Sequence, residues 1–108
     1  MAVGETKDAG WEIGVSRTVP LSLDEAWARI EDPVAWLGEP AVDVRSLHPL
    51  KLIRIGWNGT IVQVRVVAVK TGTSVRFHQE RLGGAEERER QRQHWRAVID
   101  RLFPELSR

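Results

Sequence analysis

The last quarter of the chain, residues 85–106, is the feature that most constrains the fold. Its apolar residues recur at spacings of three and four, as expected for a helix with one buried stripe; they are Trp95, Val98, Ile99, Leu102, Phe103 and Leu106. Towards the start of the segment, the same stripe meets Gln91 and Arg88 instead of apolar residues. The pattern therefore predicts one long helix that closes a core at its C-terminal end and presents polar groups at its N-terminal end.

Length and charge bound the class of protein. The 108 residues fit a single domain over 11–106 that follows a flexible lead over 1–10. Sixteen basic and fifteen acidic side chains give a net charge of +1, which argues against a dedicated nucleic-acid-binding protein. No apolar run is long enough to cross a bilayer, and residues 1–10 lack the hydrophobic segment of a secretory signal. We therefore expect a cytoplasmic protein.

The first third of the chain predicts one strand and two short helices. Residues 11–19 alternate between apolar and polar side chains, which is typical of a strand with one buried face. Ser22 with Glu25 forms a capping-box pattern that begins a helix. Asp32, followed by proline, begins a second helix that ends at Gly38.

The middle of the chain predicts a meander of strands. Asn58-Gly59 is a strong hairpin signal, because both residues tolerate positive φ. The predicted strands cover Ala41–Leu47, Leu50–Trp57, Thr60–Val69 and Ser74–Leu82. The fold class is therefore α+β: an antiparallel sheet of about five strands gripping a long C-terminal helix, with two short helices after the first strand.

Three segments carry a resemblance to a known superfamily: Trp11–Gly38, Thr73–Leu82 and Glu87–Leu102. In these segments and in its element order the chain resembles the helix-grip fold of the START-like or SRPBCC superfamily. It is most similar to the branch named for the activator of the heat-shock protein 90 ATPase. The resemblance implies a cavity between the long helix and the curved sheet that binds apolar molecules. It implies no catalytic residue, because the superfamily has no universal catalytic motif.

The chain departs from this superfamily by two strands. Only three residues join Gly38 to Val42, where similar proteins place two more strands. The shortening leaves the predicted strand Ala41–Leu47 at an edge of the sheet, where Asp43 and Arg45 are typical of residues that discourage edge pairing. The alternative is that this edge pairs with a second copy of the chain in a homodimer.

The candidate ligand-binding residues follow from the predicted faces of the strands and helices. Apolar walls would enclose a pocket with a polar end, where Arg88 could hold a carboxylate through two parallel hydrogen bonds. In the alternative, Arg88 only meets solvent or Glu80. Of the five tryptophans we expect Trp57 and Trp36 to be the least buried, and the sequence leaves open whether Trp36 belongs to the core. The predicted site comprises Arg88, Gln91, Trp95, Ile53, Ile55, Trp57, Val75, Phe77 and Trp36.

The sequence indicates no catalytic, cofactor or metal site. It contains no cysteine, and its three histidines are isolated and lack metal-ligand spacing. We expect His78 to form a surface pair with Glu80, and His94 to lie on the helix face opposite the apolar stripe.

The leading functional hypothesis is a non-enzymatic domain that binds a small apolar or aromatic molecule. A protein-interaction module with a chaperone partner is the alternative that the resemblance suggests. A polyketide cyclase or aromatase-like enzyme, or a protein that sequesters an antibiotic, ranks third.

Overall fold

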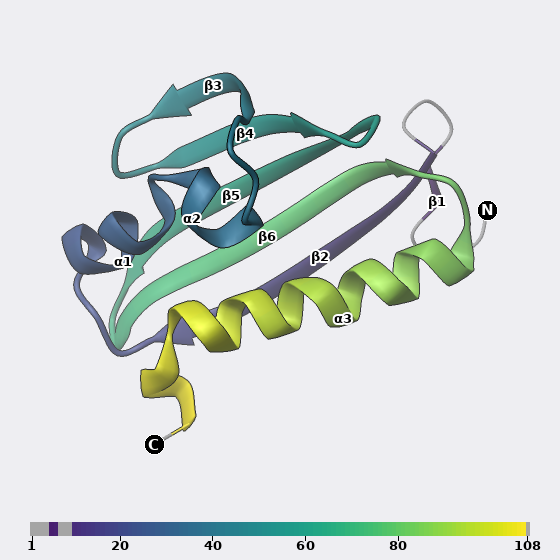
Figure 1. The fold of residues 1–108 in the computed structure, drawn as a ribbon. Helices are drawn as coiled ribbons and strands as arrows, with labels where there is room; N and C mark the ends of the chain where they lie inside the picture. Colours follow the sequence, from purple (N-terminus) through teal and green to yellow (C-terminus); the bar gives the residue numbers. More distant parts are fainter. Residues whose placement is uncertain (1–4, 7–9, 108) are drawn as a thin grey trace.

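The computed structural model describes residues 5–6 and 10–107, which form one antiparallel sheet and a layer of helices (Figure 1). Along the sheet the strands lie in the order β1-β2-β6-β5-β4-β3. The α+β class and the five predicted strands, which are β2 to β6, are confirmed. In chain order the elements are β1 (Glu5–Thr6), β2 (Gly10–Val19), α1 (Leu23–Ile30), α2 (Pro33–Leu37), β3 (Asp43–His48), β4 (Leu52–Trp57), β5 (Thr60–Val69), β6 (Gly72–Leu82), α3 (Ala85–Leu102) and the 3-10 helix η1 (Pro104–Ser107).

The flexible lead predicted over residues 1–10 falls mostly outside the described residues, which omit 1–4, 7–9 and 108. Its described part forms the two-residue strand β1 and the first residue of β2, and these two strands pair with each other. None of the described helices is both long and apolar enough to cross a membrane.

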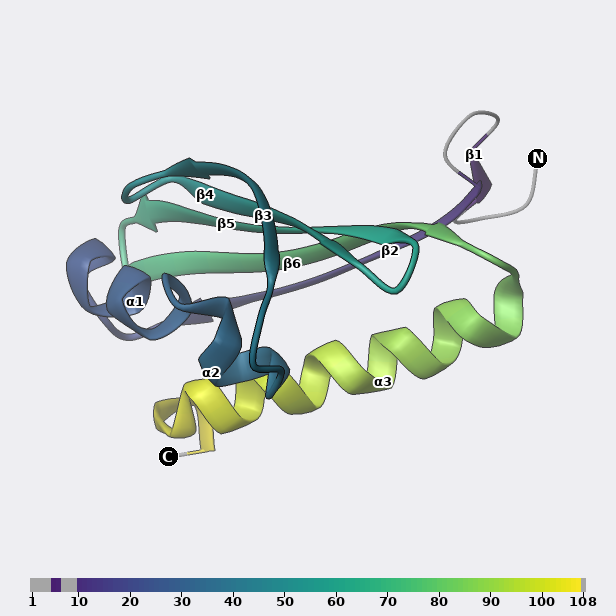
Figure 2. The same ribbon diagram turned by 45° about the horizontal axis from the view of Figure 1, so that its top comes forward.

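The helices form a second layer on one face of the sheet. Figure 2 shows α3 running along that face, with α2 next to the C-terminal half of α3 and α1 at the end of the sheet where α3 finishes. The core lies between the two layers, because the alternating strand residues Ile53, Ile55, Val75 and Phe77 point towards the helices and are buried.

Local signals set the ends of the short helices as predicted. The Ser22 hydroxyl accepts a hydrogen bond from the backbone N–H of Glu25 at 3.2 Å, and the Asp32 carboxylate accepts one from the N–H of Val34 at 3.2 Å. Gly38 ends α2 in the left-handed conformation, with a φ of 75°. Asn58 and Gly59 have φ values of 50° and 74°, which fit the predicted two-residue hairpin.

The C-terminal helix is shorter than predicted. It ends at Leu102 and not at Leu106, because the residue before a proline is disfavoured in the helical conformation. Phe103 precedes Pro104 and has a φ of −127° and a ψ of 71°. Phe103 is nevertheless buried, so the apolar stripe continues past the end of the helix.

Several strand boundaries also differ from the prediction. β2 begins at Gly10 instead of Trp11, and β6 begins at Gly72 instead of Ser74. β3 covers Asp43–His48, not Ala41–Leu47, and it lies at the edge of the sheet as expected. β4 begins at Leu52, because Leu50 has a φ of 62° in the turn that joins it to β3.

Candidate ligand-binding site

The structure brings the predicted apolar walls together under α3. Phe77 and Trp95 stack with ring centroids 5.3 Å apart, and the Trp57 ring meets Trp95 edge to face at 5.5 Å. Ile53, Ile55, Val75, Phe77 and Trp95 are all buried, and Trp57 is partly buried as expected.

Trp36 is buried, so the expectation that it would be among the least buried tryptophans is wrong. Only 1% of its surface is exposed. Its ring meets Phe77 at 5.2 Å, and its indole N–H donates to the carbonyl of Ile30 at 3.0 Å. The turn at Asp32 folds α2 back under the sheet, so Trp36 packs into the core together with the walls from β6 and α3.

The aromatic rings of these walls pack against one another and fill the space between them. The hollows found at the β2–α3 junction and on the rest of the surface are lined by other residues. In this conformation, a ligand at the predicted walls would have to displace one of the rings that now touch.

A chain of hydrogen bonds crosses the core beside these rings. The Trp95 indole N–H donates to the Gln79 Oε1 at 2.7 Å, and the Gln79 Nε2 donates to the Thr60 hydroxyl at 2.9 Å. Thr60 in turn donates to the carbonyl of Trp57. Because Gln79 is 2% exposed and both of its amide ends are used, it is a fully satisfied buried polar group.

The sequence contained a signal for these polar residues. Gln79 is two positions after the inward Phe77, and Thr60 is two positions before the buried Val62. Strand alternation therefore places both side chains on the core face. A buried Trp, whose N–H needs an acceptor, gives a reason for such a residue to lie there.

Two polar atoms at the margin of this cluster have no partner among the described residues. They are the Gln91 Oε1 and the His94 Nε2, and both are shielded from solvent. The two side chains lie one helical turn apart on α3, so they are neighbours on its surface. Buried polar atoms without partners are rare in folded proteins and indicate a place where a water molecule or a ligand group completes the hydrogen bonding.

His94 does not lie opposite the apolar stripe, as the sequence suggested, but beside it. Its ring stacks on Trp57 with a centroid distance of 5.6 Å and meets Trp95 edge to face at 4.5 Å. Burial, and secondarily the charge of Arg101, lowers the pKa of His94 below its ordinary value. The neutral imidazole is therefore favoured, and only a neutral imidazole offers a nitrogen acceptor.

Trp57, on the sheet, covers the His94 side chain of α3. It ends β4, next to the Asn58-Gly59 turn, and its indole N–H donates to the Glu39 carboxylate at 2.9 Å. Figure 2 shows the tip of the β4–β5 hairpin bending towards the helix layer. We name Trp57, Gln91, His94 and Trp95 the hairpin–helix site.

Arg88 lies elsewhere. Its Nε donates to the backbone carbonyl of Glu12 on β2 at 2.8 Å, so it joins α3 to the strand edge and meets neither a pocket nor Glu80. Glu80 pairs with Arg54 at 3.2 Å, and His78 lies 3.6 Å from the Glu12 carboxylate. The predicted His78–Glu80 pair is therefore wrong, because His78 pairs with Glu12 on the adjacent strand β2, and Glu80 pairs with Arg54 on β4, across β5.

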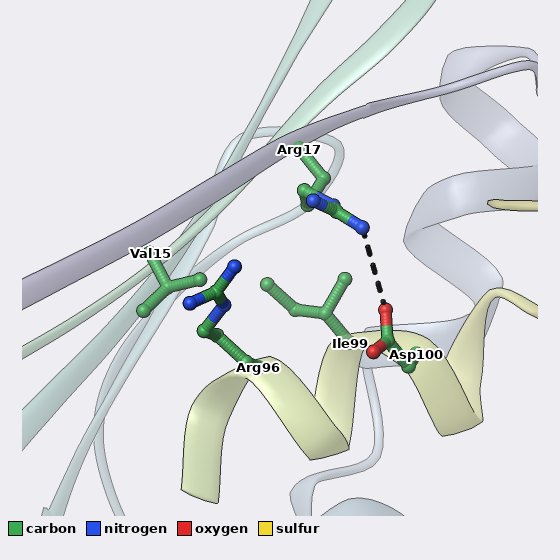
Figure 3. Close-up of a pocket in the computed structure, with 5 residues that line it drawn as sticks. All are labelled: Val15, Arg17, Arg96, Ile99 and Asp100. Carbon is green, nitrogen blue, oxygen red and sulfur yellow. Dashed lines mark ion pairs between the residues drawn. The ribbon is translucent and has the colours of Figure 1, made fainter. Parts of the chain in front are cut away.

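A small hollow lies on the β2 side of α3 and is shown in Figure 3. Its volume is about 50 Å³, and it is lined by Val15, Arg17, Arg96, Ile99 and Asp100. Pockets for small molecules usually measure about 300–1,000 Å³. This hollow therefore has room for a few atoms at most.

Metal-ligand side chains do not cluster in the described residues. Within the described ranges, 5–6 and 10–107, no three His, Asp or Glu side chains come together as a metal site requires.

Comparisons with known proteins identify the fold. No protein-family model matches the sequence, and no match was found among curated proteins. Solved structures do match. A protein from Staphylococcus saprophyticus has a TM-score of 0.75 and 11% identity over 89% of this chain and 91% of its own.

Two further matches carry informative names. An AHSA1-like protein from Rhizobium etli has a TM-score of 0.65 and 18% identity, over 90% of this chain and 83% of its own. An Aha1 dimer from Colwellia psychrerythraea has a TM-score of 0.66 and 14% identity, over 85% of this chain and 92% of its own. At these identities the likeness concerns the fold, and the chain has an Aha1-like fold of the START or SRPBCC kind.

Proposed function

We propose that this protein is a non-enzymatic binding domain for a small aromatic molecule that carries hydrogen-bond donors, and that the molecule binds at the hairpin–helix site. The observation that carries the proposal is the pair of buried polar atoms, Gln91 Oε1 and His94 Nε2, which no described residue satisfies. Leaving a buried acceptor without a donor costs about 1–3 kcal/mol. A ligand that supplies donors to both atoms would recover that free energy on binding.

The rings around these acceptors favour a flat ligand. The Trp57 ring already stacks on the His94 imidazole, so a planar molecule could take the place of one ring in that stack. Opening the site would require the β4–β5 hairpin to move, because Trp57 lies next to its turn. One hydrogen bond, from Trp57 to Glu39, ties this ring to the loop after α2.

Native mass spectrometry of the protein purified from its source tests this proposal. We expect a chain mass increased by one small molecule. The adduct should be lost from Gln91→Leu, which keeps most of the side-chain volume and removes the acceptor. It should persist in the matched control Gln93→Leu, because Gln93 is exposed on the same helix. A bare chain mass for the unmodified protein, or an adduct unaffected by Gln91→Leu, would contradict the proposal.

A second candidate function is self-association through the edge strand β3. Val44 and Leu47 are 46% and 45% exposed although they pair directly with the inward Ile55 and Ile53. They therefore extend the apolar face of the sheet beyond the cover of the helices, which supports a homodimer. The irregular pairing between Val44 and Ser46, and the Asp43–Arg45 ion pair at 3.1 Å, would oppose strand-to-strand addition.

Sedimentation velocity distinguishes a homodimer formed through β3 from a monomer. A dimer that Leu47→Lys dissociates supports association through β3. A monomer at every concentration would reject it.

The remaining hypotheses rest on fewer observations. The match to the Rhizobium etli protein supports our proposal that this chain lacks two strands that similar proteins contain. It joins 90% of 108 residues here to 83% of a protein described as residues 1–152. A chaperone partner, a cyclase activity and antibiotic sequestration stay predictions from resemblance alone, and so does a cytoplasmic location.

A further inference from the structure

Among the described residues, the outer edge of β2 has no partner strand beyond Trp11. From Ile13 to Val19, β2 pairs with β6 on one side. On its other side it meets β1 only at Gly10 and Trp11, and no other described strand lies there. An open edge presents backbone N–H and C=O groups that another extended chain can bond.

Helix α3 runs beside this edge in a fixed register. Arg88 bonds the carbonyl of Glu12 at 2.8 Å, and Asp100 lies 3.7 Å from Arg17. The two contacts show that helix and strand run in the same direction over this length, as Figure 1 also shows. The small hollow of Figure 3 lies between them, with Val15 and Arg96 in its lining.

One side of α3 carries a row of arginines that runs along the β2 edge. Arg88, Arg92 and Arg96 are each four residues apart, so they share one side of α3. Arg92 and Arg96 line a second hollow of about 180 Å³ whose other side is the segment 14–17 of β2. Arg96 has no ion-pair partner among the described residues, and Arg92 has only an exposed contact with Glu89 at 3.8 Å.

We propose that an extended acidic segment of a partner protein adds to the β2 edge and pairs its carboxylates with Arg92 and Arg96. The repeat distances agree. Residues four apart on a helix rise by about 6 Å. Alternate residues on a strand, which point to the same side, are about 6.6–6.8 Å apart. Acidic side chains at every second position would therefore meet successive arginines while the backbone bonds the open edge.

The edge favours a peptide over a nucleic acid. A peptide strand uses the backbone groups of β2, which a sugar–phosphate chain cannot match in register. Recognition would then depend on both backbone bonding and charge, and each can be tested separately.

The test uses the peptide acetyl-TETETET-amide, titrated into ¹⁵N-labelled protein and followed by NMR. We expect shifts of β2 amides from Gly14 to Arg17, with binding that weakens as salt is raised. A version N-methylated at alternate backbone nitrogens should bind about tenfold more weakly, because it cannot form the strand hydrogen bonds. An octathymidylate serves as the nucleic-acid arm.

Variants of the helix locate the site. The double variant Arg92→Gln/Arg96→Gln should weaken peptide binding about five- to tenfold. Arg90→Gln, on another side of the same exposed helix, should change it by less than about twofold. No shift of β2 amides, equal binding by the N-methylated peptide, equal loss in Arg90→Gln, or tighter binding by the octathymidylate would each overturn the proposal.

Discussion

Replacing Gln79 with leucine is the change that most directly probes the polar chain in the core. The substitution keeps a side chain of similar size and removes two hydrogen bonds, to Trp95 at 2.7 Å and to Thr60 at 2.9 Å. Each bond contributes about 1 kcal/mol, and the stranded Trp95 N–H adds about 1–3 kcal/mol, because Trp95 is fully buried. We therefore expect Gln79→Leu to lower the free energy of unfolding by about 3–5 kcal/mol.

Urea denaturation followed by far-ultraviolet circular dichroism measures this loss without depending on the emission of Trp95. The midpoint should fall while the slope with denaturant stays unchanged, as it does for a change in stability alone. Gln93→Leu is the control, and it should stay within about 0.5 kcal/mol of the parent because Gln93 is exposed.

A double-mutant cycle isolates the contact. Trp95→Phe removes the donor, so adding Gln79→Leu to it should cost about 2–4 kcal/mol less than Gln79→Leu costs alone. If Gln79→Leu costs less than about 0.5 kcal/mol, or if the two changes are additive, the bond does not hold α3 to the sheet in the way described.

Three further changes test other parts of the structure. Arg29 forms two hydrogen bonds to Glu105, at 2.6 and 2.7 Å, and one to the carbonyl of Leu102, so Arg29→Lys should lower the free energy of unfolding by about 1–2 kcal/mol in a thermal melt, whereas Arg90→Lys should not. Gly72→Ala places a Cβ 2.0 Å from the carbonyl oxygen of Val19, so it should lower the free energy of unfolding by more than about 3 kcal/mol in the same urea assay. The control Gly38→Ala, whose Cβ meets no atom within 4 Å, should lower it by only about 1 kcal/mol. The lowered pKa of His94 means that the unfolded chain binds more protons than the folded one just below pH 6.5, so stability should fall as the pH drops through 6.5. His94→Asn should flatten this fall in urea titrations at several pH values. An unchanged pH profile would contradict the burial of the imidazole.

Local sequence signals predicted the sheet and its inward faces well. The Asn58-Gly59 turn and the alternation of β5 and β6 specify which side chains point inward, and Val75 and Phe77 are buried as predicted. Alternation depends only on strand geometry, so it survives whatever packs on the face. The same rule would have placed Gln79 and Thr60 in the core.

Features set by distant packing were not predictable in this way. The burial of Trp36 depends on where α2 folds back, and the place of His94 depends on the β4–β5 hairpin reaching α3. Arg88 lies on the predicted stripe, but the path of β2 decides that its partner is the carbonyl of Glu12. The early end of α3 before Pro104, in contrast, was readable from the proline alone.

The most direct test of the proposed binding site compares two probes by ¹H–¹⁵N NMR of the histidine and tryptophan side chains at pH 7.5. 2-Naphthol has a hydroxyl donor, and 2-methoxynaphthalene has the same rings without it. We predict that 2-naphthol shifts the His94 ring nitrogens and the Trp57 indole N–H, and that it binds about tenfold more tightly, the equivalent of one hydrogen bond. Equal binding of the two probes, or shifts that avoid His94 and Trp57, would contradict the account.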